Sequence, residues 1–188
     1  MDRFTDTLII TILITGIVPL IAYIIDTIEG AITRLLCKVI GFKAAIFVMN
    51  NLTFTGTIHH ELSHALVAFL TGAKVRKVEL FKPDKEANTL GKVVFTPRGP
   101  LVLKSIQIGL TSVAPIIFGG TTSTLLIQLL NNYKATMVGW QTGIISYVIT
   151  SILIHMRMSK QDIKNYIKVT PVLDIIIFII IYIVKFCI

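Results

Sequence analysis

Long apolar stretches separated by short polar or basic connections constrain the fold of this chain more than any other feature. In a bilayer, backbone N–H and C=O groups need partners within the protein, so an apolar stretch that crosses it folds as a helix. Such a helix needs about 20 residues to cross a hydrocarbon core of about 30 Å. We predict spans over 7–25, 53–72, 101–130 and 138–154, a final apolar segment over 171–186, and an interfacial or re-entrant helix over 28–49.

Polar and helix-breaking residues refine these boundaries. Asp26 and Glu29 are expected to end the first span. Residues 114–115 (Ala-Pro) and 119–120 (Gly-Gly) interrupt the third, which is tolerated where neighbouring groups satisfy the freed backbone. The expected fold class is therefore an all-α polytopic membrane protein with four to six membrane segments, in a single domain over 1–188 with its core at about 53–168.

The charge pattern supports this interpretation and excludes nucleic-acid binding. Only 15% of the 188 residues are charged, against about 25% in a soluble domain. The net charge is +8, but the basic residues gather between apolar stretches instead of forming one stripe with aromatic residues. Segments 74–104 and 155–168 hold eight and four Lys/Arg, and 131–134 holds one. The positive-inside rule places the first two in the cytosol of an integral plasma-membrane protein, where they would contact anionic lipid.

The segment between the second and third spans has the pattern of a small β-hairpin. Residues 74–80 and 91–95 resemble strands, and residues 83–88 have turn composition. We expect a cytosolic hairpin within 73–98. Cys37 and Cys187 lie far apart and define neither a disulfide framework nor a zinc knuckle.

The second predicted span carries His60-Glu61-Leu62-Ser63-His64. Residues four apart share one face of a helix, so His60 and His64 can bind the same cation, while Glu61 can reach a water molecule on that cation. Ionisable groups inside a span are costly and usually mark a functional site. The pattern predicts a Zn²⁺ site with an open position for water.

Two histidines leave zinc one protein ligand short. The candidates near a span are Asp26, His155, Asp162 and Asp174. Asp162 follows the fourth span, and Ser159-x-x-Asp162 also has the pattern of an ordinary capping box. Asp174 lies within the final apolar segment.

These motifs resemble those of the site-2 protease family of intramembrane zinc metalloproteases. Residues 60–64 match its His-Glu-x-x-His element, and residues 114–119 resemble its Gly-Pro-type break with Ala114 in place of glycine. The family's third element contributes an aspartate within a Leu-Asp-Gly signature. Asp162 occupies the corresponding place without that signature, whereas Leu173-Asp174 keeps the pair but lies one segment later. The resemblance favours Asp162 and leaves Asp174 as the alternative third ligand.

The resemblance implies hydrolysis of peptide bonds within or next to the bilayer. Zinc on His60, His64 and Asp162 would activate a water molecule, and Glu61 would act as general base. The substrate would be a membrane protein or peptide, which the hairpin could hold by adding it as a strand. The alternatives are a non-catalytic metal-binding membrane protein that binds or shields a partner, and a transporter whose His and Asp residues line an ion path. Neither alternative needs a carboxylate between the two histidines.

Overall fold

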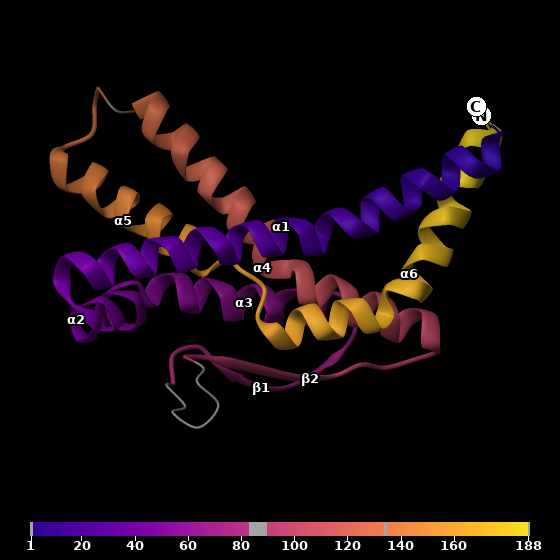
Figure 1. Ribbon diagram of the computed structural model, residues 1–188, viewed down its shortest axis with the longest axis horizontal. Helices are drawn as coiled ribbons and strands as arrows, with labels where there is room; N and C mark the ends of the chain where they lie inside the picture. Colours follow the sequence, from indigo (N-terminus) through magenta and orange to yellow (C-terminus); the bar gives the residue numbers. More distant parts are fainter. Residues whose placement is uncertain (1, 83–89, 134, 188) are drawn as a thin grey trace.

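The fold, taken from a computed structural model, consists of long helices with one small antiparallel hairpin (Figure 1). The structure describes residues 2–82, 90–133 and 135–187. Its elements are α1 (Arg3–Ile40), α2 (Phe42–Phe47), the π-helical turn η1 (Val48–Leu52), α3 (Phe54–Leu70), β1 (Lys74–Glu79), β2 (Lys92–Thr96), α4 (Leu101–Tyr133), α5 (Gly139–His155) and α6 (Lys160–Cys187). The predicted fold class is confirmed.

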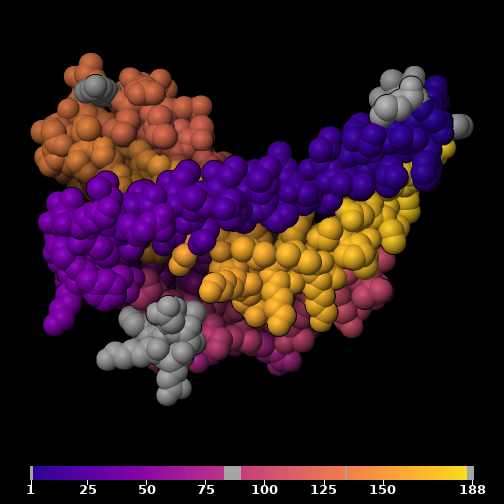
Figure 2. All heavy atoms as spheres, viewed as in Figure 1, coloured from indigo at the N-terminus to yellow at the C-terminus, as the bar shows by residue number. Residues whose placement is uncertain are grey.

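Three helices, α1, α4 and α6, are long and apolar enough to cross a membrane. Helices α3 and α5 have 17 residues each, which corresponds to about 25 Å of helix. At 38 residues, α1 is about 57 Å long and exceeds the hydrocarbon core. Figure 2 shows α1 lying along the length of one face, with α6 packed against its N-terminal half.

The helix that contains the first predicted span does not end with it at Asp26 and Glu29, because α1 continues to Ile40. Both acids form ion pairs with Arg157, at 2.9 and 2.7 Å, so they are accommodated inside the helix. The helix ends where Gly41 adopts a φ of 81°, a conformation that side-chain-bearing residues rarely adopt. The predicted separate helix over 28–49 is therefore divided between α1, α2 and η1.

The third predicted span is one helix, because α4 runs through the Ala-Pro and Gly-Gly pairs at 114–120 without a break. Proline removes one backbone hydrogen bond and bends a helix without necessarily ending it. Figure 1 shows α4 changing direction partway along, and α6, which contains Pro171, does the same.

Helices α1 and α6 are joined by a hydrogen bond that a proline makes possible. Pro19 lacks the N–H that would bond to the carbonyl of Thr15, four residues earlier. The hydroxyl of Tyr166 donates to that carbonyl oxygen at 3.1 Å. Phe4 and Phe178 pack edge to face at 5.2 Å, which places the two ends of the chain side by side (Figure 1).

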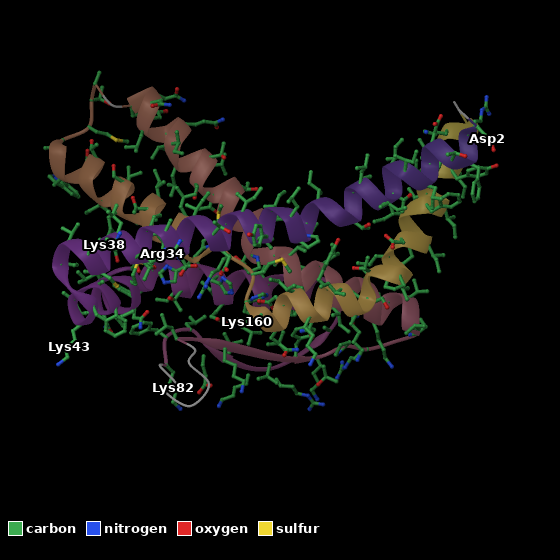
Figure 3. The ribbon with its side chains drawn as sticks, in the orientation of Figure 1. Asp2, Arg34, Lys38, Lys43, Lys82 and Lys160 are labelled. Atoms are coloured by element: carbon green, nitrogen blue, oxygen red, sulfur yellow. The ribbon has the colours of Figure 1, made fainter. Side chains whose placement is uncertain are left out.

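The hairpin is present as predicted. Strands β1 and β2 pair antiparallel, with Val78 opposite Val93 and a register shift between Val75 and Lys77. The predicted turn at 83–88 lies outside the described residues. Glu79 accepts ion pairs from Lys77 and Lys82, which hold the pKa of its carboxyl below the usual value. Figure 3 shows the basic side chain of Lys43, at the start of α2, extending away from the helices.

Candidate metal centre

The buried face of α3 is polar, and its exposed face is apolar. Thr57, Glu61 and His64 are buried together with Ala68, at spacings of three and four residues that place them on one face. Leu62, Leu66, Phe69 and Leu70 are exposed. A helix that turns polar residues inward and leucines outward suits a lipid environment around a polar site.

Ser151 of α5 holds the start of α3. Its hydroxyl donates to the carbonyl of Thr53 at 2.8 Å and accepts from the Gly56 N–H at 2.7 Å and the Thr55 hydroxyl at 2.8 Å. A Cβ on Gly56 would collide with the backbone carbonyl of Ser151, so glycine allows the two helices to approach closely. The serine therefore satisfies backbone groups that a helix start leaves free.

Gln107 of α4 holds the other end of α3. The side chain is fully buried; its amide nitrogen donates to the carbonyl of Thr71 at 2.9 Å, and its amide oxygen accepts from the N–H of Arg98 at 2.8 Å. The sequence interpretation did not identify Gln107 or Ser151. The available signal was a polar residue within an apolar stretch, which usually has a hydrogen-bonding role there.

The Nε2 atoms of His60 and His64 point toward each other, as the motif predicts, and the two rings are nearly perpendicular. Their Nε2 atoms are 3.1 Å apart and their ring centroids 4.7 Å apart. Nδ1 of His60 lies 2.7 Å from the carbonyl oxygen of His155, and Nδ1 of His64 lies 2.7 Å from that of Thr111. A carbonyl only accepts hydrogen bonds, so both Nδ1 atoms carry a proton, and in the neutral imidazoles both Nε2 atoms then present lone pairs.

Pro115 explains why the carbonyl of Thr111 is free to accept from His64. In an uninterrupted helix, that carbonyl would bond to the N–H of residue 115. Proline has no N–H, and Nδ1 of His64 takes its place at 2.7 Å. The Ala114-Pro115 element therefore supplies a hydrogen-bond acceptor for a histidine on the neighbouring helix.

Asp162, at the start of α6, completes the group. Its Oδ2 lies 3.5 Å from Nε2 of His64 and accepts from the N–H and hydroxyl of Ser159, at 3.0 and 2.6 Å. The hydroxyl of Ser159 in turn accepts from the N–H of Asp162 at 3.1 Å. Asp162 thus takes part in the capping box suggested by the sequence and still faces the histidines.

The structure brings together His60, His64 and Asp162 as the group of metal-ligating side chains in its described residues, with ligand atoms within 4.8 Å of one another. The other candidates lie elsewhere. Asp26 pairs with Arg157, and His155 contributes its backbone carbonyl. The buried Oδ1 of Asp174 has no hydrogen-bond partner among the described residues.

The donor set fits a zinc ion. Two lone-pair nitrogens and a carboxylate oxygen converge, and like partial charges at such distances repel unless a cation lies among them. A tetrahedral zinc ion with bonds of about 2.05 Å separates its ligand atoms by about 3.3 Å, close to the observed 3.1 and 3.5 Å. Each histidine is also oriented by a carbonyl on its other nitrogen, as zinc-binding histidines usually are.

Glu61 belongs to α3, and its side chain lies against the hairpin. Its side chain is 8% exposed, and a Cβ on Gly91 would lie 2.6 Å from its Cγ. Glycine at the entrance to β2 therefore lets the hairpin backbone approach this carboxylate. His59 points elsewhere, with Nε2 3.1 Å from the hydroxyl of Thr122 on α4. One helix thus presents two facing imidazoles and, beside them, a buried carboxylate.

Comparison with known proteins gives one family match, over part of the chain. Residues 31–92, which contain the histidine motif and β1 but only the first residue of β2, match the family model described as Peptidase M50B-like. Neither the curated proteins nor the solved structures include a match to the chain. The family match is consistent with the resemblance to site-2 proteases. The match covers about a third of the chain, and the three apolar helices indicate an integral membrane protein.

Proposed function

We propose that this protein is a membrane-embedded zinc endopeptidase that hydrolyses peptide bonds within or next to the bilayer. His60, His64 and Asp162 hold the zinc ion, and Glu61 is the general base. The observation that carries the proposal is the convergence of two Nε2 atoms and one carboxylate oxygen, with 3.1 Å between the Nε2 atoms and 3.5 Å from Nε2 of His64 to Oδ2 of Asp162. The buried carboxylate of Glu61 follows His60 directly on the same helix.

The chain's own residues can perform the proton transfers of peptide hydrolysis. A bound zinc ion would acidify a water molecule and polarise the peptide carbonyl. Glu61 takes a proton from the water molecule while the water oxygen bonds to the carbonyl carbon. Glu61 then delivers that proton to the peptide nitrogen as the C–N bond breaks. The carbonyls of His155 and Thr111 keep both imidazoles in the tautomer that leaves Nε2 unprotonated.

The hairpin offers a place for an extended substrate. In the described residues the sheet has two strands, so each strand keeps one unpaired edge. A cavity of about 300 Å³ lies between β2, α4 and α6, lined by Val93, Val94, Phe95, Pro97, Ile108 and Asn165. A substrate segment that pairs with β2 there would expose its amide bonds near Glu61, because Gly91 at the start of β2 adjoins that carboxylate.

The proposal is tested with the full chain in detergent micelles. Zinc per chain is measured by elemental analysis, and cleavage of reconstituted single-span peptides is followed by mass spectrometry. We expect one zinc ion per wild-type chain, and we expect Glu61→Gln to keep the ion while losing cleavage. Glu79→Gln, which changes a carboxylate on β1, is the matched control.

Two outcomes would contradict the proposal. Cleavage by Glu61→Gln at the wild-type rate removes Glu61 from the mechanism. Zinc binding by a wild-type chain that cleaves none of the peptides would favour a non-catalytic metal-binding protein that binds or shields a partner.

A further inference from the structure

We infer that Arg157 is a positioning residue. It joins α1 to the α5–α6 connection, residues 156–159, and this connection in turn orients two of the three proposed metal ligands. The inference rests on the proposed function and extends it to a part of the chain outside the site. The observation is that Arg157 forms two ion pairs, with Asp26 and Glu29, which lie more than 125 residues before it in the sequence.

The connection supports two ligands at once. His155, directly before it, provides the carbonyl oxygen that accepts from Nδ1 of His60 at 2.7 Å. Ser159, at its end, donates its N–H and hydroxyl to Oδ2 of Asp162, at 3.0 and 2.6 Å. Arg157 lies midway between them. A displacement of this short segment would therefore disturb the orientation of His60 and Asp162 together.

One face of α1 contacts the connection at two points. Ala22, Asp26 and Glu29 follow one another at spacings of four and three residues, so they lie on one side of the helix. Met158 is buried in an apolar cluster with Ala22. Beside it, Nη1 of Arg157 lies 2.9 Å from Oδ1 of Asp26, and its Nε lies 2.7 Å from Oε2 of Glu29.

The ion pairs, more than packing, restrain Arg157. The arginine borders an open cavity of about 540 Å³, so neighbouring atoms leave its outer side free. Its guanidinium donates a hydrogen bond to Asp26 and lies within ion-pair distance of Oε2 of Glu29, an arrangement that the more compact ammonium group of lysine reproduces poorly. The side chain of Glu29 is only 16% exposed, and an unpaired carboxylate in that position is costly. Removing the arginine therefore leaves the helix with an unbalanced charge and the connection without its ionic anchor.

The test measures metal affinity, since a merely structural role for Arg157 would lower stability without changing the ligand geometry. Co²⁺ is titrated into metal-depleted full-length protein in detergent micelles, and its visible absorption reports both affinity and coordination. Thermal unfolding of the metal-free protein is recorded in parallel. Arg34→Ala is the matched control, because Arg34 lines the same cavity but belongs to α1 itself (Figure 3).

We expect Arg157→Ala to weaken Co²⁺ binding by about 10-fold, the lower end of the loss for a residue hydrogen-bonded to a metal ligand, because Arg157 acts through His155 and Ser159. Arg157→Lys should fall between this variant and the wild type and preserves the charge if the alanine variant folds poorly. Arg157→Glu combined with Glu29→Arg should restore part of the affinity lost in Arg157→Glu. Arg34→Ala should bind as the wild type does.

Three outcomes overturn the inference. The first is wild-type affinity and absorption in Arg157→Ala, and the second is an affinity loss that the charge-swapped pair does not recover. The third is an equal loss in Arg34→Ala. A wild-type chain that binds neither Co²⁺ nor Zn²⁺ would instead overturn the proposed function, so the two failures are distinguishable.

Discussion

The carbonyl oxygen of Thr111 accepts a hydrogen bond from Nδ1 of His64, at 2.7 Å, across the contact between α4 and α3. Pro115 leaves this carbonyl without its helical partner. The same device joins α1 to α6, where Pro19 frees the carbonyl that the Tyr166 hydroxyl reaches. In both cases, a proline inside a helix provides a buried acceptor for a side chain of another helix, which satisfies a backbone group that lipid could not.

Replacing Pro115 with alanine should weaken metal binding. The new N–H would compete with His64 for the carbonyl of Thr111, and the imidazole would lose the bond that orients it. We expect a loss of about tenfold or more in zinc affinity without loss of helix stability, since proline is costly inside a helix. Competition with a chelator measures the affinity. Pro19→Ala makes the same change in α1, and an equal loss there would contradict the explanation.

Alanine variants of the candidate ligands should separate Asp162 from Asp174. His64→Ala and Asp162→Ala each remove an atom of the converging group and should reduce zinc to well below one ion per chain. Asp174→Ala should retain zinc, because Asp174 lies outside that group in the described structure. Elemental analysis of the purified variants measures this. Full zinc in Asp162→Ala together with its loss in Asp174→Ala would reverse the assignment.

Gly91→Ala should reduce catalysis while leaving zinc in place. The added Cβ would lie 2.6 Å from Cγ of Glu61 and 2.9 Å from the carbonyl oxygen of Glu79, so the hairpin or the carboxylate must move. A displacement of about 1 Å in a catalytic group can lower a rate about 100-fold, and we expect peptide cleavage to slow by about 10- to 100-fold on this basis. The cleavage rate at saturating peptide and the zinc content are compared with those of Gly143→Ala, whose Cβ would meet no atom within 4 Å. An unchanged cleavage rate would show that the hairpin does not position Glu61.

Ser151→Ala should destabilise the protein through the start of α3. The substitution removes an acceptor for the Gly56 N–H and a donor to Thr53 at a buried position. Leaving buried backbone groups without partners costs about 1–3 kcal/mol each. We expect a free energy of unfolding lower by about 2 kcal/mol, measured by denaturation in micelles. Thr150→Ala, at the adjacent exposed position, should change it little, and equal losses would contradict the role of Ser151.

Local patterns in the sequence were sufficient to predict several parts of this structure. The four-residue spacing of His60 and His64 places both rings on one face of any helix, whatever surrounds it. The alternating residues on either side of residues 83–88 predicted the hairpin. The same local reasoning did not show that the helix continues past Asp26 and Glu29, because the arginine that pairs with them inside α1 lies in a distant segment.

By itself, the sequence determined the apolar helices, the hairpin and the pair of facing histidines, since each depends on residues a few positions apart. Only the tertiary structure decided that Asp162, and not Asp174, lies beside those histidines. It also decided that the carbonyls of Thr111 and His155 orient them. The physical reason is that these contacts join helices distant along the chain, and their geometry depends on how the helices pack.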